Sequence, residues 1–392
     1  MSQSVTVARY IGMTVLLLIR QLAIGGAERQ LVSLACELKT RRIDVHVAVF
    51  YGGGVLESEL IDCGIPIIFL NKSSRWDIFS FAWTFVRAVG KIRPTIIYSF
   101  LTGPNLCALI ARIRFPKQII FWGVRASADD HILRQNDWLV RLAFWVSIRF
   151  SRVPNSIITN SSKSRDTLVA FGVPSPQIAV VSNGVDTERF RRHIKKGLDF
   201  RASLGIDAAE LLIGIVARID PIKDHRTFFS GAAILLQEHP NTRFLVIGDG
   251  NPEYIKQLQS CSTARQLAKN LLWIGEQQDM VSVYNALDLN TLTSTSEGFP
   301  NTILEAMACG IPCVSSNVGD VGLIIEDQKL LFPVGDILGL VESWRHALAK
   351  KSYPDLHYDD IVKQVTENFS KEEMTEKTME VFSLHTRKRF MS

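Results

Sequence analysis

The segment from Ser294 to Cys313, STSEGFPNTILEAMACGIPC, limits most strongly what this chain can fold into. Residues 288–293 before it and 311–316 at its end are rich in apolar and β-branched side chains, which is typical of strands. Between them lie a Gly-Phe-Pro-Asn turn and a short apolar helix that ends at Gly310. Strand, polar loop, helix and strand in this order predict a parallel βαβ unit.

Two carboxylates of this segment suggest a binding site. Glu297 lies in the loop after the first strand, where open α/β sheets bind their ligands. The helix is expected to begin at Asn301 or Thr302, so its unpaired N–H groups and its dipole favour an anion such as phosphate. Glu305, one turn into the helix, suits a ribose diol because a carboxylate accepts two hydrogen bonds. By spacing alone a solvated loop glutamate and an exposed helix glutamate are the commoner explanation, but the combination describes a nucleotide-sugar site.

Residues 296–301 (SEGFPN) and 304–312 (LEAMACGIP) resemble the donor-binding signature of the family 4 retaining glycosyltransferases, which have the GT-B fold. The resemblance implies that Glu297 contacts the donor sugar and that Glu305 holds the nucleotide ribose. It also implies that the turn and the start of the helix line the donor site, with contacts from Gly298, Phe299, Pro300, Asn301 and Thr302.

The length of 392 residues fits two domains. Strand and helix alternate in each half, which predicts an α/β fold with two Rossmann-like, doubly wound parallel sheets. The resemblance implies that the two domains face a cleft and that a C-terminal helix at about 371–392 crosses back to the first domain. We expect an acceptor-binding domain over 1–190 and a nucleotide-sugar donor domain over 191–370. The charge-rich stretch from Arg191 to about Phe200 is predicted to be the linker.

Two cations follow a buried strand at 211–216. Arg218 and Lys223 stand five residues apart in the loop after this strand, where they could neutralise a diphosphate and stabilise it as a leaving group. Solvated surface charge is the commoner explanation of such a pair, but the family has an Arg and Lys pair in this same loop. The pair is therefore expected to act in catalysis together with Glu297.

The resemblance also implies roles in the donor site for glycines outside the signature. Gly25 and Gly26 follow the first strand; a plain tight turn would explain them, but the family has such glycines beside the donor phosphates. Backbone near Gly275 is expected to meet the nucleotide base. The stretch 317–322, NVGDVG, departs from the family's usual Gly-Gly.

The end of the predicted strand at 118–122 departs from the family in a second way. Many relatives have a histidine there, whereas this chain has Arg125 as the nearest candidate and His131 six residues later. A guanidinium cannot act as a base, but it can clamp a diphosphate. Either residue could fill the place of the family histidine, and we include Arg125 among the expected catalytic residues.

Charge differs between the two halves. Residues 1–190 carry 22 Lys and Arg against 13 Asp and Glu, and residues 191–392 carry 22 against 26. The basic first half suggests an anionic partner, and anionic membrane lipid or a polyprenyl-diphosphate-linked acceptor fits. Nucleic acid is not expected, because the chain has no recognised nucleic-acid module. The segment 137–152, DWLVRLAFWVSIRFSR, reads either as a core helix with snorkelling arginines or as a basic helix on the membrane surface, and we favour the core.

The chain is expected to remain in the cytoplasm, with a peripheral contact at the inner membrane face. The apolar start at 11–19 imitates a signal peptide, but no small-residue cleavage site follows, so we predict a buried first strand. The six cysteines are scattered, which predicts free buried thiols in a reducing compartment.

The sequence thus predicts a retaining glycosyltransferase that moves a hexosyl or N-acetylhexosaminyl group from a nucleotide-diphosphate sugar, a UDP-sugar above all, to a glycan or lipid-diphosphate-linked acceptor. No Asp-x-Asp pair stands in the expected loop, so no metal and no cofactor are expected. An inactive, glycosyltransferase-like binding or scaffold protein is the alternative. A nicotinamide-dependent oxidoreductase would also be doubly wound, but neither Gly-rich loop has the dinucleotide spacing.

Overall fold

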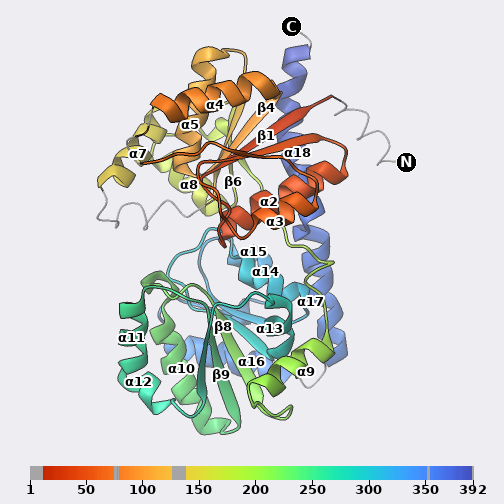
Figure 1. Ribbon diagram of the computed structural model, residues 1–392. Coiled ribbons are helices and arrows are strands. Elements are labelled where there is room, and N and C mark those ends of the chain that lie inside the picture. The colour runs from red at the N-terminus through yellow and green to blue at the C-terminus, as the bar shows by residue number, and fades with distance from the viewer. Residues whose placement is uncertain (1–11, 75–76, 78, 126–137, 351–353, 391–392) are drawn as a thin grey trace. The chain divides into compact units, whose positions relative to one another are not determined.

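The computed structural model describes residues 12–74, 77, 79–125, 138–350 and 354–390 (Figure 1). The chain forms two compact units. Unit 1 consists of Met1–Gly184 and Lys371–Ser392, and unit 2 of Val185–Ser370. The first unit therefore ends at Gly184, not at the expected 190, because Val185 already pairs with Ser370 at the end of unit 2.

Unit 1 is built on one parallel sheet. Its strands lie in the order β3-β2-β1-β4-β5-β6-β7. Their bounds are β1 (Thr14–Ile19), β2 (Asp44–Val49), β3 (Ile67–Phe69), β4 (Ile96–Phe100), β5 (Ile119–Val124), β6 (Ser156–Thr159) and β7 (Ile178–Val180). Strand β1 is buried over Val15–Ile19, as expected for the apolar start of the chain.

Helices cover both faces of the unit 1 sheet. They are α2 (Gly26–Thr40), α3 (Glu57–Asp62), α4 (Phe79–Ile92), α5 (Thr102–Arg114), α7 (Trp138–Arg149), α8 (Ser162–Ala170) and α18 (Lys371–Phe390). On one face, α2, α3 and α18 pack over alternate strand residues such as Leu17 and Phe121. On the other face, α4, α5 and α8 pack over the intervening residues such as Leu16 and Ile120. This alternation along parallel strands is the doubly wound arrangement.

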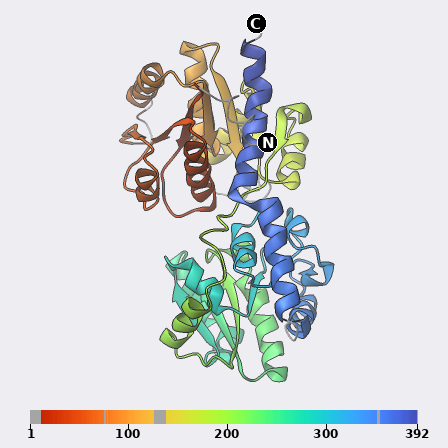
Figure 2. The ribbon, with the colours of Figure 1, turned by 90° about the vertical axis from the view of Figure 1, so that its right-hand side faces the viewer.

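The last helix, α18, belongs to unit 1, as the sequence predicted. Figure 2 shows it beside the strands and helices of that unit, and α18 packs against α2. Phe382 is fully buried between the rings of Tyr98 and Phe121, and Lys371 pairs with Glu37 of α2. The helix therefore supplies part of the core of a unit whose other elements all precede unit 2 in the sequence.

Unit 2 is built on a second parallel sheet with the strand order β10-β9-β8-β11-β12-β13. Its strands are β8 (Leu211–Val216), β9 (Thr242–Ile247), β10 (Leu271–Gly275), β11 (Leu289–Leu292), β12 (Cys313–Ser316) and β13 (Leu331–Phe332). Its helices are α9 (Ile194–Ser203), α10 (His225–Glu238), α11 (Pro252–Ser260), α12 (Ser262–Gln266), α13 (Met280–Ala286), α14 (Asn301–Ala308), α15 (Val321–Ile324), α16 (Ile337–Lys350) and α17 (Pro354–Phe369).

The signature segment forms the predicted βαβ unit. It runs from β11 through α14 to β12, and the two strands pair in parallel. Helix α14 lies on the same face of the sheet as α13 and α17, whereas α10, α12 and α16 cover the other face. The core of unit 2 thus has two layers of helices around one sheet, as the alternation of strands and helices predicted.

The stretch predicted as a linker is instead largely helical. Helix α9 spans Ile194–Ser203 and packs against α13 within unit 2. The buried guanidinium of Arg201 donates to the Ala286 carbonyl and to the Asp288 carboxylate at 2.7 Å each. The many charges of this stretch suggested an exposed linker. Arg201 is buried all the same, because its charge is paired with Asp288, which lies 87 residues later in the sequence.

The prediction of free thiols is wrong for two of the six cysteines. Cys36 of α2 and Cys63, which follows α3, form a disulfide with a Cα–Cα distance of 5.8 Å. The two residues meet because α2 and α3 pack together, which the spacing of 27 residues does not reveal. The other four cysteines are free, and Cys107, Cys309 and Cys313 are buried.

The helix predicted within 137–152 is not a core helix. In α7, Phe144 is buried, whereas Trp138, Leu142 and Trp145 are at least half exposed. None of the helices that the structure describes is long and apolar enough to span a bilayer.

Candidate functional site

Three loops of unit 2 are joined at the carboxyl edge of its sheet. They follow β8, β11 and β12, and β11 lies between the other two strands. The backbone N–H of Thr295 donates to the Ile222 carbonyl at 2.7 Å, and the Thr293 hydroxyl donates to the Lys223 carbonyl at 2.8 Å. The Ser316 hydroxyl donates to the Ser294 carbonyl at 2.6 Å. These bonds fix the loops at the edge where parallel sheets bind ligands.

Glu297 and Lys223, which lie in two of these three loops, contact each other. The Nζ of Lys223 donates to Oε1 of Glu297, and the Ser294 hydroxyl donates to the same oxygen at 2.7 Å. The Lys223 side chain is 20% exposed and the Glu297 side chain 13%. A lysine ammonium carries three donors, so one bond to Glu297 leaves it able to contact an anion as well.

The loop after β12 lies directly against the Glu297 loop. Gly319 has a φ of +57°, and a Cβ at this position would lie 2.4 Å from the Glu297 carbonyl oxygen. The backbone N–H of Asp320 donates to the Gly298 carbonyl at 3.3 Å. A side chain at Gly319 would therefore displace the Glu297 loop. Val318, which precedes Gly319, is buried in the core of unit 2.

Helix α14 begins at Asn301, within the predicted range. Its N-cap is Pro300, which has no side-chain acceptor for the first turn. The N-terminal N–H groups of the helix follow the Glu297 loop directly, so the positive end of the helix dipole lies at the same edge of the sheet.

Glu305 receives a hydrogen bond that the sequence did not predict. The hydroxyl of Tyr284, a fully buried residue of α13, donates to Oε2 of Glu305 at 2.8 Å. Burial, together with the nearby Glu305 carboxylate, raises the pKa of Tyr284 well above its usual value, so its hydroxyl remains a donor. Tyr284 thus fixes one oxygen of the carboxylate that is predicted to hold the ribose.

The loop after β9 supports the loop that carries Arg218. Gly248 has a φ of +135°, and a Cβ there would lie 2.0 Å from the Ala217 carbonyl oxygen. The side chain of Arg218 is 63% exposed, and its guanidinium lies 3.4 Å from the Asp220 carboxylate. Gly275 ends β10 and accepts a hydrogen bond from the Gly248 N–H at 2.9 Å, so it lies at the same edge of the sheet.

The remaining residues of the signature turn face the protein interior. Gly298 and Pro300 are buried, and Phe299 is 4% exposed with its ring 5.4 Å from the ring of Phe369. Asn301 and Thr302 are half-buried in the first turn of α14. The structure therefore brings Glu297 and Lys223 together and places Asn301 and Thr302 at the start of the helix that follows the same loop, whereas the ring of Phe299 belongs to the core.

His225 is a buried polar residue beside this assembly that the sequence did not single out. Its side chain has no exposed surface, and neither ring nitrogen has a hydrogen-bond partner within the described residues. Burial, with the positive charge of Lys223 nearby, lowers the pKa of His225 to about 4. The imidazole is therefore neutral at physiological pH.

The predicted glycines of unit 1 lie at the carboxyl edge of its own sheet. Gly25 is the N-cap of α2, and Gly26 is the first residue of that helix. The carboxylate of Glu28 folds back over Gly25, where an added Cβ would lie 2.2 Å from a carboxylate oxygen. Burial raises the pKa of Glu28, although a hydrogen bond from its own backbone N–H opposes this effect.

Arg125 lies in a buried hydrogen-bond network of unit 1. Its guanidinium donates to the Tyr98 hydroxyl and to Oδ1 of Asn183 at 3.0 Å each, and it lies 5.3 Å from the centre of the Phe100 ring. The residue is 8% exposed. These contacts tie β4, β5 and the segment after β7 together, and the expected diphosphate contact stays a prediction. His131, the alternative, lies outside the described residues.

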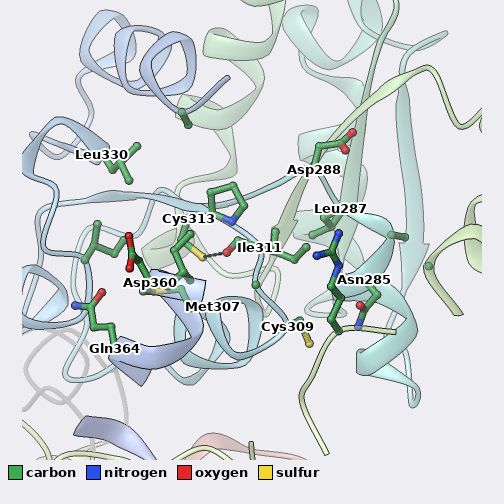
Figure 3. Close-up of a pocket in the computed structure, with 18 of the residues that line it drawn as sticks. Asn285, Leu287, Asp288, Met307, Cys309, Ile311, Cys313, Leu330, Asp360 and Gln364 are labelled. Atoms are coloured by element: carbon green, nitrogen blue, oxygen red, sulfur yellow. Dashed lines mark hydrogen bonds between the residues drawn. The ribbon is translucent and has the colours of Figure 1, made fainter. Parts of the chain in front are cut away.

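A cavity of about 890 Å³ in unit 2 lies away from the predicted donor residues (Figure 3). Its lining includes Asp288 just before β11, Cys309 at the end of α14 and Cys313 at the start of β12. On the opposite side Figure 3 shows Asp360 and Gln364 of α17. The cavity thus lies at the amino edge of the sheet, at the far end of α14 from the predicted phosphate site.

Two family models match this chain. "Glycosyltransferase Family 4" matches residues 24–189, and "Glycosyl transferases group 1" matches residues 198–364. Together they match well over half of the chain.

Two curated glycosyltransferases are similar to this chain. A UDP-Gal:alpha-D-GlcNAc-diphosphoundecaprenol alpha-1,3-galactosyltransferase of Escherichia coli is 28% identical over 194 residues, which cover 48% of this chain and 50% of that protein. A D-inositol 3-phosphate glycosyltransferase of Saccharomonospora viridis is 31% identical over 206 residues, which cover 50% and 46%. The chain thus spans about half the length of these relatives.

Solved structures share the fold over nearly the whole chain. Anabaena Alr3699/HepE in complex with UDP-glucose matches with a TM-score of 0.81 at 21% identity, covering 95% of this chain and 99% of that one. The two parallel sheets, the folded signature segment and the two family models lead to one conclusion. The chain belongs to the family 4 glycosyltransferases of the GT-B fold.

Proposed function

We propose that this protein is a retaining, metal-independent glycosyltransferase that uses a UDP-sugar. It moves a hexosyl or N-acetylhexosaminyl group to a glycan or lipid-diphosphate-linked acceptor in polysaccharide or glycan biosynthesis. The observation that supports this most is the convergence of Glu297, Lys223 and the start of α14 at the carboxyl edge of the unit 2 sheet. The names of the relatives add to it, because one uses UDP-galactose and one was solved with UDP-glucose.

In this proposal fixed positive charge stabilises the leaving group. Arg218, Lys223 and the first N–H groups of α14 face the negative charge that develops on the diphosphate when its bond to the anomeric carbon breaks. Glu297 orients the sugar hydroxyls, and Lys223 and Ser294 hold its carboxylate. Glu305 holds the ribose, with one oxygen fixed by Tyr284.

The acceptor hydroxyl attacks on the face from which the diphosphate departs. A new bond forms between the acceptor oxygen and the anomeric carbon, the bond from that carbon to the phosphate oxygen breaks, and the departing phosphate takes the acceptor's proton. This front-face route needs no separate strong base, so the absence of a histidine at the family position, where Arg125 is the nearest residue, is tolerated. A lipid-linked acceptor lies at a membrane, so the proposal includes a peripheral contact of this chain with an anionic cytoplasmic membrane face.

A thermal-shift panel tests the donor. UDP, GDP and ADP, each free and as the glucose and N-acetylglucosamine conjugates, would be compared with NADH on the full chain. Stabilisation follows RT ln(1 + [L]/Kd), so a ligand at about 100 times its Kd adds about 2.7 kcal/mol. We expect UDP and one UDP-sugar to raise the melting temperature and NADH to leave it unchanged.

A hydrolysis and transfer assay tests the reaction. The UDP-sugar selected by the panel would be incubated with the chain, and release of UDP would be followed with and without short polyprenyl-diphosphate sugars. Binding without any turnover across the acceptors would favour the inactive binding protein. Stabilisation by NADH and by no nucleotide sugar would contradict the proposal.

A further inference from the structure

The outer side of α4 carries a stripe of aromatic and basic residues. Phe79, Trp83, Arg87 and Lys91 follow each other at intervals of four, so they lie on one side of the helix. Phe79 is 91% exposed and Trp83 is 71% exposed, while Phe81 and Phe85 between them are buried against the sheet. The helix therefore places one set of aromatic rings in the core and a second set in solvent.

Helix α7 carries a stripe of the same kind. Trp138, Leu142 and Trp145 are at least half exposed, and Arg141 and Arg149 are exposed beside them. The spacing of three and four residues places all five on one side of the helix. Helices α4 and α7 both pack against α5, on one side of the unit 1 sheet (Figure 1). We call these two stripes together the aromatic–basic face.

Charge on this part of unit 1 has a single sign. Residues 79–125 and 138–152, which contain α4, α5 and α7, hold ten Lys and Arg and no Asp or Glu; the three acidic residues between these ranges, at 129, 130 and 137, lie outside the described residues. In α8, on the same face of the sheet, Arg165 pairs with Asp166. Within the described residues, Arg87, Lys91, Arg141 and Arg149 form no ion pair. Their charge is thus not neutralised by the described part of the protein.

The opposite face of the same sheet is different. There Arg29 pairs with Glu59, Arg41 with Glu376 and Lys371 with Glu37, so α2, α3 and α18 balance their charges among themselves. The unbalanced positive charge and the exposed tryptophans therefore belong to one face of unit 1.

We infer that the aromatic–basic face docks on an anionic lipid bilayer. Tryptophan side chains favour the interface between lipid headgroups and acyl chains, and Lys and Arg beside them are attracted to anionic headgroups. The face combines both features, and α4, α5 and α7 carry no acidic residue among the described residues. The inference rests on the proposed function in that a lipid-linked acceptor would bring the protein to a membrane.

Co-sedimentation of the full chain with vesicles tests this inference. One vesicle is phosphatidylcholine alone, and the other an equal mixture of phosphatidylcholine and phosphatidylglycerol. We expect binding to the mixed vesicles that weakens with added salt, and little binding to phosphatidylcholine. Trp83→Ala with Trp145→Ala, and separately Arg87→Glu with Arg149→Glu, should each weaken the apparent affinity at least about tenfold, since several contacts are lost together.

Matched double variants serve as controls. Ile61→Ala with Leu384→Ala removes exposed apolar side chains from the opposite face of unit 1, and Lys256→Glu with Lys269→Glu makes the same charge reversal on unit 2. Both should bind vesicles as the wild type does. The inference is overturned if the wild type binds neither vesicle or if the controls lose binding as much as the face variants. It is also overturned if light scattering shows a dimer that the face variants abolish, because the face would then bind a second copy of the chain.

UDP stabilisation, measured without vesicles, separates this inference from the proposed function. The face variants should keep the wild-type thermal shift with UDP, because none of the substituted residues is among the predicted donor or catalytic residues. Vesicle binding without any response to UDP would leave the membrane inference standing and contradict the proposed donor. A UDP response without vesicle binding would support the proposed donor and contradict the membrane inference.

Discussion

At the scale of single residues, variants of Glu305 and Tyr284 distinguish the predicted ribose contact of Glu305 from its hydrogen bond with Tyr284. Glu305 is predicted to hold the ribose, and it also accepts the hydrogen bond of the buried Tyr284 hydroxyl. Glu305→Ala removes both interactions, and since hydrogen bonds to charged groups contribute about 1.5–3 kcal/mol, we expect the Kd for UDP to rise at least about tenfold. Isothermal titration calorimetry measures this change.

Tyr284→Phe is the matched control for that variant. It removes the hydroxyl but keeps the carboxylate, so it should lower the free energy of unfolding by about 1.5–3 kcal/mol and leave the Kd for UDP within about threefold of the wild type. Equal weakening of UDP binding in both variants would mean that Glu305 acts through the packing of α13 and α14 and not as a ribose ligand.

His225 gives the protein a predictable response to acid. Its pKa in the folded protein is about 4, below the ordinary value of 6.5, because burial and Lys223 disfavour the charged ring. The unfolded chain therefore binds the proton first as the pH falls. The free energy of unfolding is therefore unaffected by protonation of His225 above pH 6.5, and it falls progressively as the pH drops towards 4, by roughly 3 kcal/mol in all.

Urea unfolding between pH 7 and pH 4 measures this contribution. His225→Leu removes the titrating group, so the free energy of unfolding of the variant should fall less steeply with acid than that of the wild type. His239→Asn, a change at an exposed histidine, should keep the wild-type slope. Identical slopes in the wild type and His225→Leu would contradict the assignment.

Gly319 belongs to the scale of elements, because it determines how the loops after β11 and β12 fit together. Gly319→Ala places a side chain at φ +57° and 2.4 Å from the Glu297 carbonyl oxygen. The left-handed backbone alone costs about 1–2 kcal/mol, and the close contact must move the Glu297 loop. We expect lower stability in urea and a lost or reduced thermal shift with UDP.

Gly322→Ala is the control three residues later. The nearest atom to its added Cβ lies 3.7 Å away, in ordinary contact, so stability and the UDP response should stay at wild-type values. If Gly319→Ala also kept both, the close approach of the two loops would not matter for the donor site.

Local pattern was enough to predict most elements but not the contacts between them. Strand β8 has the predicted bounds and helix α14 begins within the predicted range, since one is a continuous apolar run and the other a short apolar helix after a turn. Helix α9 was missed because its charges pair with residues far along the chain, as Arg201 does with Asp288. The contact between Lys223 and Glu297 spans 74 residues, and the sequence assigned both to the ligand because nothing local indicated that they meet.

At the scale of the whole molecule, the chain begins and ends in the same unit. The core of unit 1 is completed by α18, which follows all of unit 2 in the sequence. Unit 1 therefore cannot complete its core until the last residues are present, whereas unit 2 is formed from one continuous stretch, Val185–Ser370. Damage to α18 should accordingly be felt in unit 1 alone.

Phe382→Ala tests this dependence. The ring is fully buried against Tyr98 and Phe121, and removing a buried phenylalanine costs about 3–5 kcal/mol. Hydrogen exchange followed by mass spectrometry should show lower protection in β1, β4 and β5 and unchanged protection in β8, β9 and β11. Leu384→Ala, two residues away and 64% exposed, should leave both sheets as protected as in the wild type. Equal loss of protection in the two sheets would show that unit 2 depends on α18 as well, and the division of the core would have to be redrawn.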